Sequence, residues 1–341
     1  MRSALISQWP EACSHGSLTH AGARLAVLFA CVALALFIIP SLQAQWPFAT
    51  PAVPASTPFT GFSNTGAGGS NAPDRDVPLI EKAFNQLSNQ DVGILGQKAL
   101  AIKPEAWKHA ETDNFILHYR RVTEAKKVAR EVEYDLWFVA TSLGAKKSQY
   151  EKKSHVFVFA DDKEWQEFLG ETTVPAWAAS FARGDNLYLN VRNTGGREIF
   201  DSRTLAHETT HAVVARLYPQ SRWPLWLNEG FAEYMGGASV AARKGESIKR
   251  QEHALNFAGM SLDQLQKMQQ YPQDPIEVAQ LYETSEKLIR FIETQLPKDR
   301  FPRFLDSVLS GRTLEDALHD VYPDKLASND DFEKKYAKFS K

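Results

Sequence analysis

The chain is poor in cysteine, has no strong excess of either charge, and lacks an apolar run long enough to span a bilayer. Its two cysteines, Cys13 and Cys31, lie near the beginning of the 341 residues, which excludes a disulfide framework for the remainder. The 39 basic and 41 acidic side chains leave a net charge of −2, without the basic field that holds nucleic acid. Apolar (43%) and charged (23%) residues occur in ordinary globular proportions, which excludes a mainly disordered or multi-span membrane protein.

The first 44 residues have the pattern of an export signal. Arg24 precedes an apolar run of 15 residues at 25–39, shorter than the roughly 20 residues of a bilayer span. A proline and small residues follow, which predicts cleavage after Ala44 and hence a secreted protein or one of the periplasm or cell envelope. The alternative is an uncleaved membrane anchor, because the stretch before the apolar run is long for a secretory signal.

Composition divides the rest of the chain into a linker and one domain. Residues 45–78 are rich in Pro, Gly, Ser and Thr, and are expected to form a flexible linker that is either inhibitory or a simple tether. Residues 79–341 have globular composition and are expected to form a single domain with a sheet-containing half at 79–200 and a helical half at 201–341.

Within this domain, strand patterns come before a long helical stretch, which predicts the α+β class. The expected strands are 114–120, 155–160 and 186–191. The expected helices are 123–143, 162–169, 202–217, 225–242, 247–258, 261–267, 275–295, 298–310, 313–320 and 329–339. The segment 79–110 is weakly marked and is also expected to be helical.

The motif His207-Glu208-Thr209-Thr210-His211 lies on the expected helix 202–217. Residues four apart share one helix face, so both imidazoles can point at one metal ion. Glu208 can face the open coordination position and take a proton from a water that the metal activates. The alternative is an ordinary helix that carries two histidines.

A third ligand is required, because catalytic zinc usually keeps three protein ligands and one water. Glu229, in the segment WLNEGFAEY and 18 positions after His211, is the expected ligand. Two proline-containing turns separate the motifs, and Pro224 is well placed to open the second helix. The chain can therefore turn back and bring Glu229 beside the histidines.

Together these motifs resemble those of the gluzincin metallopeptidases, most closely their compact peptidase-MA-like branch. The resemblance implies that His207, His211 and Glu229 hold Zn²⁺ and that Glu208 is the general base. It also implies a thermolysin-like catalytic domain, with a small N-terminal mixed sheet followed by a mostly helical part. The likeness is specific in the two motifs and looser over about 113–340.

The resemblance extends to residues around the ligands. Glu233, one helical turn after Glu229, falls where thermolysin-like members place a carboxylate that orients the first histidine, and Asn228 is expected to support the third ligand. The alternative for Glu233 is a position on the solvent face of its helix. Tyr282 is the expected hydrogen-bond donor to the oxyanion, because in larger gluzincins a similar Tyr-Glu-Lys-Gly segment begins a helix. The match is partial, and the alternative donors are Tyr218, Tyr234 and His253.

In gluzincins the strand before the zinc helix forms a sheet edge that pairs with extended substrate. The resemblance therefore assigns substrate binding to Asn186, Leu187 and Tyr188 on the expected strand 186–191, and the alternative is an ordinary interior strand. The chain lacks the Gly-x-Met-Glu-Asn box of aminopeptidase N-like members. This absence argues against an aminopeptidase and favours an endopeptidase.

Other aromatic residues and histidines are expected to have structural roles. Trp223, Trp226 and Phe231 fit core packing better than a substrate pocket. The remaining histidines are expected to be surface or structural residues rather than ligands. They include His109, His118, His155, His253 and His319.

The sequence thus predicts an exported zinc metallopeptidase that acts on a peptide or protein, with no nucleic-acid partner and with membrane contact only through an uncleaved signal. One alternative is a zinc hydrolase of a non-peptide amide or ester, since the chemistry would be the same. The other is a non-catalytic envelope or interaction module that keeps the fold. Glu208 speaks against the second, because metal binding alone does not need it.

Overall fold

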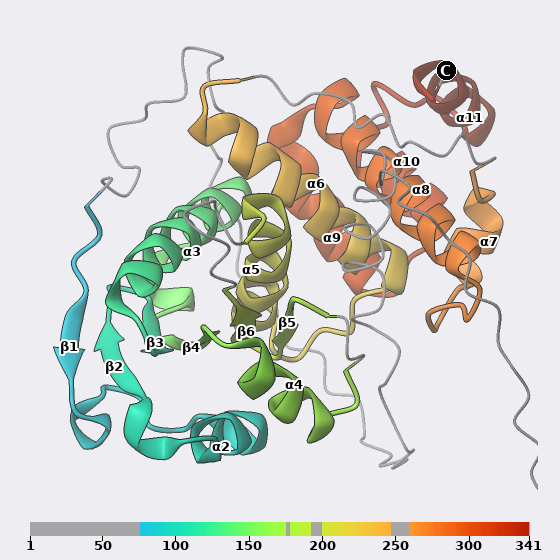
Figure 1. Cartoon of the computed structure of the whole chain (residues 1–341). Coiled ribbons are helices and arrows are strands. Elements are labelled where there is room, and N and C mark those ends of the chain that lie inside the picture. Colours follow the sequence, from blue (N-terminus) through green and yellow to red (C-terminus); the bar gives the residue numbers. More distant parts are fainter. Residues whose placement is uncertain (1–75, 175–177, 192–199, 247–258, 341) are drawn as a thin grey trace, which may run out of the picture.

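The computed structural model of the chain describes residues 76–174, 178–191, 200–246 and 259–340 (Figure 1). The expected signal, nearly all of the expected linker, the expected helix 247–258 and His253 lie outside the described residues. Within them, no helix combines the length and the apolar character needed to cross a bilayer.

A six-stranded mixed sheet occupies the N-terminal half, in the order β1-β2-β3-β4-β6-β5. Its strands are β1 (Ile80–Lys82), β2 (Lys108–Glu111), β3 (Phe115–Tyr119), β4 (Ser154–Phe159), β5 (Ser180–Arg183) and β6 (Asn186–Asn190). The central strands β3, β4 and β6 are parallel, whereas β1, β2 and β5 join antiparallel. Every residue of β3 and β4 is buried, as expected for parallel strands covered on both faces.

Ten α-helices lie in the described residues, and most of them follow the sheet in the chain. They are α2 (Gly93–Ala101), α3 (Val122–Ser142), α4 (Asp162–Gly170), α5 (Ser202–Leu217), α6 (Leu225–Arg243), α7 (Leu262–Lys267), α8 (Pro275–Gln295), α9 (Phe301–Leu309), α10 (Leu314–Val321) and α11 (Asn329–Phe339). This order confirms the predicted α+β class.

Two hydrophobic cores lie on the two faces of the sheet. Leu117, Val156 and Leu189 face the larger core, which contains α3 and α5 and continues into the helices from α6 onward. Phe157 and Tyr188 face the smaller, aromatic core under α2 and α4. Figure 1 shows α3 and α5 on one side of the sheet and α2 and α4 on the other. The larger core thereby holds α5 against both the sheet and α6.

The prediction of helix over 79–110 is wrong for most of that segment. It contains β1, most of β2 and two short 3₁₀ turns, and only α2 is α-helical. β1 has three residues and pairs with β2, which in turn pairs with β3. Strands this short show no usable alternation, and they form because a neighbouring strand accepts their hydrogen bonds.

Candidate metal centre

Helix α5 carries the two histidines and is buried along most of its length. Asp201 caps its start, since the Asp201 side chain accepts hydrogen bonds from the backbone N–H groups of Arg203 and Thr204. The hydroxyls of Thr209 and Thr210, between the histidines, each donate at 2.8 Å to the carbonyl four residues earlier. The polar residues of the motif can therefore be buried without leaving unsatisfied hydroxyls.

Glycines allow α6 to approach its neighbours closely enough to bring Glu229 to α5. A Cβ atom on Gly236 would lie 3.0 Å from the Arg203 carbonyl oxygen, and one on Gly230 would lie only 2.5 Å from the Ser285 carbonyl oxygen of α8. Gly230 directly follows Glu229, so the close packing of α6 against α8 fixes the backbone next to the ligand. This explains why glycine, rather than a larger residue, follows the acidic residue.

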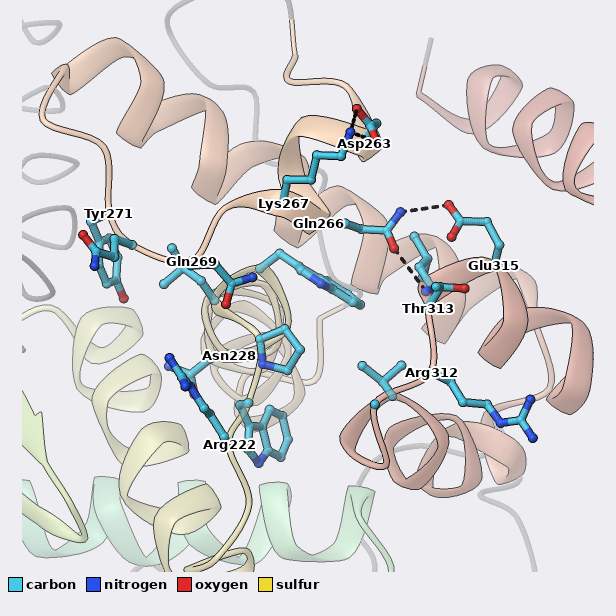
Figure 2. A pocket seen from close by; sticks show the side chains of 18 of the residues that line it. Arg222, Asn228, Asp263, Gln266, Lys267, Gln269, Tyr271, Arg312, Thr313 and Glu315 are labelled. Atoms are coloured by element: carbon cyan, nitrogen blue, oxygen red, sulfur yellow. Dashed lines mark hydrogen bonds and ion pairs between the residues drawn. The ribbon is translucent and has the colours of Figure 1, made fainter. Parts of the chain in front are cut away.

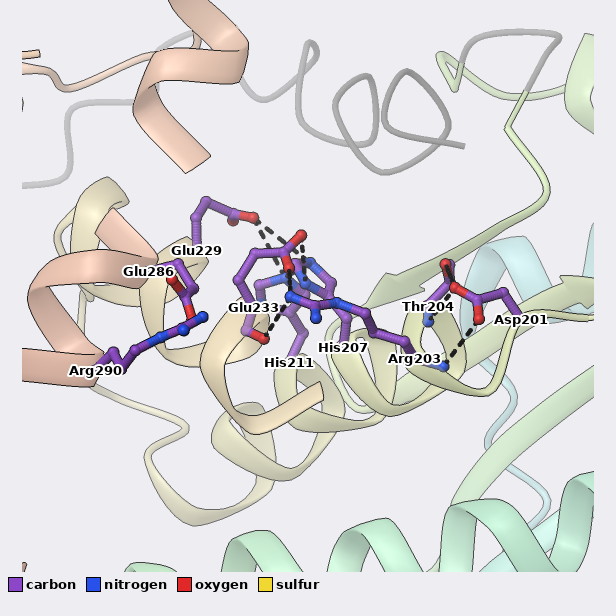
Figure 3. A network of polar contacts seen from close by, with 9 residues as sticks. All are labelled: Asp201, Arg203, Thr204, His207, His211, Glu229, Glu233, Glu286 and Arg290. Carbon is purple, nitrogen blue, oxygen red and sulfur yellow. Dashed lines mark hydrogen bonds and ion pairs between the residues drawn. The ribbon is translucent and has the colours of Figure 1, made fainter. Parts of the chain in front are cut away.

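His207, His211 and Glu229 converge as the sequence predicts (Figure 3). The two histidine Nε2 atoms are 3.0 Å apart, and each lies 3.6 Å from Glu229 Oε2. A point equidistant from these three atoms is about 2.0 Å from each, which is the length of a metal–nitrogen or metal–oxygen bond. The three side chains could therefore hold a metal ion, although this donor set is not specific to zinc.

Carboxylates dominate the electrostatics of this cluster. Burial alone would lower the pKa of the His207 imidazole, but Glu229, Glu233 and Glu208 outweigh burial and raise this pKa to about 9. Burial would likewise raise the pKa of Glu229, but the two histidines outweigh it and hold that pKa well below its usual value. Buried negative charge therefore surrounds the imidazoles, which favours a bound cation.

Glu208 lies next to the cluster and is only 1% exposed. Its Oε2 accepts a hydrogen bond of 2.9 Å from the backbone N–H of Ala182 on β5. Among the described residues, its buried Oε1 has no hydrogen-bond partner. Burial raises the pKa of this carboxyl, and the histidines oppose that rise. One oxygen is thus held by the sheet, and the other is available to a reacting proton.

Glu233 lies beside His207 but not within hydrogen-bonding distance. Its Oε1 is 3.7 Å from His207 Nδ1, and its Oε2 accepts a 2.8 Å hydrogen bond from Arg203. Its side chain is 14% exposed, which contradicts the alternative of a position on the solvent face. Glu233 therefore acts on His207 through its charge, and Arg203 holds it in place.

Asn228 and Tyr271 bind the other oxygen of the third ligand. Glu229 Oε1 accepts a 3.0 Å hydrogen bond from Asn228 Nδ2 and a 2.5 Å hydrogen bond from the Tyr271 hydroxyl. Asn228 thus contacts Glu229, the residue that it is predicted to support. Tyr271 was not predicted, because it lies in the irregular segment between α7 and α8, where no periodicity marks a functional residue. Burial, and then the Glu229 carboxylate, raise the pKa of Tyr271 well above its usual value.

Tyr282 lies at the cluster, about two turns inside α8 rather than at a helix start. Its ring stacks on that of His207 with centroids 6.2 Å apart, and its hydroxyl hydrogen-bonds Tyr271. Of the alternative donors that the structure describes, Tyr218 packs edge-on against Trp223. Tyr234 lies close to charged residues of α8. The structure therefore brings Tyr282, among the predicted oxyanion donors, next to a candidate ligand.

The expected edge position of strand 186–191 is wrong. β6 lies between β4 and β5 and pairs with both, so it has no free edge for a substrate. Leu187 and Tyr188 are buried in opposite cores, and Asn186 Oδ1 accepts a hydrogen bond from the His155 backbone N–H. In the described part of the chain, the terminal strand on this side is β5, which the sequence analysis missed. Strand order depends on tertiary pairing and is not contained in a local pattern.

Comparison of the chain with protein-family profiles and with curated proteins finds no match.

Proposed function

We propose that this chain is a zinc-dependent metallopeptidase, more an endopeptidase than an aminopeptidase, with a thermolysin-like catalytic domain and an exported location. The observation that carries the proposal is the position of Glu208, between a converging His-His-Glu donor set and strand β5. A site that only stored a metal ion would not need a buried carboxylate with one free oxygen beside the ligands.

The donor set supports zinc as the metal. Two histidines and one glutamate are the ligands of thermolysin-type catalytic zinc, which keeps a fourth position open. The spacing of the three donor atoms accommodates an ion of this size. When bound, zinc would supply Lewis-acid polarisation of the scissile carbonyl and increase the acidity of water at the site.

The chain's own residues would carry the proton transfers. Glu208 takes a proton from the attacking water on Oε1, while the Ala182 N–H keeps Oε2 in place. Glu208 then delivers that proton to the leaving amine, for which a raised carboxyl pKa is suited. The Tyr282 hydroxyl, next to His207, is the proposed donor to the oxyanion.

Strand β5 is the proposed pairing edge for the substrate backbone. An extended peptide can add to a terminal strand by main-chain hydrogen bonds. Because Ala182 of β5 also bonds Glu208, a peptide that pairs along β5 would pass the general base. This assignment replaces the one to Asn186, Leu187 and Tyr188.

The test is cleavage of a peptide library by the purified full chain, with and without a chelator. We expect internal cleavage that the chelator abolishes and that added zinc restores. A Glu208→Gln variant should keep the metal and lose roughly 10²–10⁴-fold in rate. Zinc-loaded protein that cleaves no peptide but hydrolyses amide or ester substrates would favour the alternative hydrolase. Equal activity of Glu208→Gln would refute the assigned base.

A further inference from the structure

A cavity of about 890 Å³ opens at the N-terminal end of α6 (Figure 2). It is bounded by the start of α6, by α7 with the segment that follows it, and by the turn between α9 and α10. Its volume is at the upper end of the range for small-molecule pockets, so it can accept several residues of a peptide.

Two residues of the cavity wall also contact the candidate metal centre. Asn228 and Tyr271 both line the cavity, and both also donate hydrogen bonds to Glu229 Oε1. A ligand in the cavity would therefore lie against the same side chains that hold the third metal ligand. This proximity points to a role in binding the molecule on which the centre acts.

Charges in the cavity wall are mostly neutralised in pairs. Lys267 forms a 2.8 Å ion pair with Asp263, and Arg312 forms a 2.8 Å ion pair with Asp320. The remaining two charged lining residues, Arg222 and Glu315, have opposite signs and lie apart in Figure 2. The cavity as a whole thus has no strong field that would select an acidic or a basic ligand.

The groups left for recognition are amides and aromatic rings. Gln269, Gln270 and Gln273 line the cavity together with Trp223 and Trp226. Each amide can both donate and accept hydrogen bonds, and the indole rings offer flat apolar surface with an N–H at one edge. Among the described residues, the buried Nε1 of Trp223 has no hydrogen-bond partner. This wall is complementary to an uncharged chain rich in hydrogen-bonding groups.

A fourth glutamine, Gln266, connects α7 and α10 in the cavity wall. Gln266 donates at 2.8 Å to Glu315, and its Oε1 accepts a 3.1 Å hydrogen bond from the Leu314 backbone N–H. These two bonds join α7 to the start of α10, and both elements bound the cavity. A preformed wall loses less conformational entropy when it binds a ligand.

We propose that this cavity binds an uncharged, polar stretch of the peptide substrate, rich in Ser, Thr, Asn, Gln or Gly, close to the bond that is cleaved. The proposal rests on the proposed function, because a peptide bound beside Glu229 is a substrate only if the candidate metal centre cleaves peptides. Peptide amides match the glutamine side chains in both donors and acceptors, and an extended peptide can reach both the cavity and the metal centre.

The first test measures peptide binding to the zinc-loaded Glu208→Gln chain by calorimetry. Three peptides of equal length share one core and differ in flanks made of Ser and Asn, of Asp, or of Lys. We expect the neutral peptide to bind about tenfold more tightly than either charged one, since burying an unpaired charge is unfavourable. Equal binding of all three peptides overturns the proposal, as does binding of a neutral oligosaccharide but of no peptide.

A charge introduced into the cavity should change this preference. Gln269→Lys should shift binding about tenfold towards the Asp-flanked peptide, and Gln269→Glu towards the Lys-flanked one. Gln97→Lys is the matched control, because Gln97 is exposed on α2, beyond the opposite face of the sheet. Identical peptide preferences in Gln269→Lys and Gln97→Lys would place the bound peptide outside the cavity.

Cleavage assays with the unsubstituted chain separate this proposal from the proposed function. Chelator-sensitive cleavage that is equally fast for all three flanks would retain the peptidase and reject the cavity assignment. Neutral peptide binding that Gln269→Lys alters, together with no cleavage of any peptide, would retain the cavity as a peptide site and reject the peptidase.

Discussion

Two groups of histidines in this molecule have ring nitrogens at nearly the same separation, yet their surroundings differ completely. In the candidate metal centre, His207 and His211 approach to 3.0 Å. In the sheet, His109 and His118 approach to 2.8 Å, and His118 and His155 to 2.9 Å. Close approach of imidazoles is therefore not sufficient to identify a metal site.

The arrangement of donor atoms is the first difference. The Nε2 atoms of His207 and His211 face one carboxylate oxygen, so three donors surround one point. His118 instead uses Nδ1 for one neighbour and Nε2 for the other, so the histidines of β2, β3 and β4 form a row. A row of hydrogen-bonded rings offers no common centre to an ion.

The sign of the pKa shift is the second difference. Buried carboxylates raise the pKa of His207 to about 9 despite its burial. Burial lowers the pKa of His155 to about 4, although Asp185 and Asp91 oppose the shift. Burial also holds the pKa of His118 well below its usual value, and the neighbouring histidines add to this effect. Carboxylates thus favour positive charge at the imidazole in one region, whereas burial favours neutral imidazoles in the other.

The largest expected effect would test this comparison directly. His207→Ala should lose bound zinc, because it removes one of three converging ligands, whereas His118→Phe should keep about one zinc per chain. Phenylalanine preserves the stacking of residue 118 on Phe157. Metal content after dialysis measures both outcomes. Zinc that persists in His207→Ala and disappears in His118→Phe would reverse the assignment of the two groups.

The next effect concerns turnover alone. Tyr282→Phe should keep zinc and substrate binding but lose about 10²–10³-fold in kcat, because a single oxyanion donor contributes about that much. Steady-state kinetics on a cleaved peptide separates kcat from KM. Tyr234→Phe, which removes a hydroxyl that lies near Glu293 and Glu286 of α8, is the control. Parental kcat in Tyr282→Phe would assign the oxyanion to another donor, such as Tyr271.

Helix caps, prolines and helical spacing are local signals, and they account for the parts of this site that the sequence predicts. The bounds of α5 and α8 follow from caps and prolines, with Asp201 before one helix and Asp274 and Pro275 at the start of the other. Helical spacing then aligns the ligands of α5. The convergence with Glu229 could be expected because two prolines force the chain to turn between the helices.

The parts that were missed depend on contacts distant in sequence. Strand β5 has four residues and is defined by its pairing with β6. Tyr271 has no regular neighbours, and only the fold brings its hydroxyl to Glu229. The interior position of β6 depends on which strands accept its hydrogen bonds, and a buried apolar strand looks the same in either position.

An acid-stability measurement would sharpen the contrast between the two groups. A histidine whose pKa is lowered by folding takes up a proton more readily when unfolded, so its stabilising contribution is complete above about pH 6.5 and is lost as the pH falls to about 4. For His155 this loss is on the order of 3 kcal/mol. Urea unfolding at several pH values should therefore show a smaller acid loss in His155→Asn than in the parent protein.

The control for this measurement is His319→Asn, since His319 is exposed on α10. It should leave the pH dependence unchanged. Burial raises the pKa of Asp135 to about 7, so this carboxyl stabilises the fold as the pH falls, opposite to His155. The informative quantity is therefore the difference in the pH dependence of the unfolding free energy between variant and parent. Equal pH slopes in all three proteins would show that the row of histidines does not resist protonation.

The smallest expected effect is the contribution of the Glu233 carboxylate to zinc affinity at the candidate metal centre. Glu233→Ala should weaken zinc affinity about 10–100-fold, the usual loss when a residue that supports a metal ligand is removed. Competition with a chromogenic chelator measures the affinity, and Glu277→Ala, on the exposed first turn of α8, is the matched control.

A second variant, Glu233→Gln, distinguishes an effect of charge from an effect of hydrogen bonding. Because Glu233 Oε1 lies 3.7 Å from His207 Nδ1, beyond hydrogen-bonding distance, the effect is Coulombic and glutamine should lose as much affinity as alanine. Affinity retained in Glu233→Gln but lost in Glu233→Ala would instead mean that the two side chains form a hydrogen bond once the ion is bound.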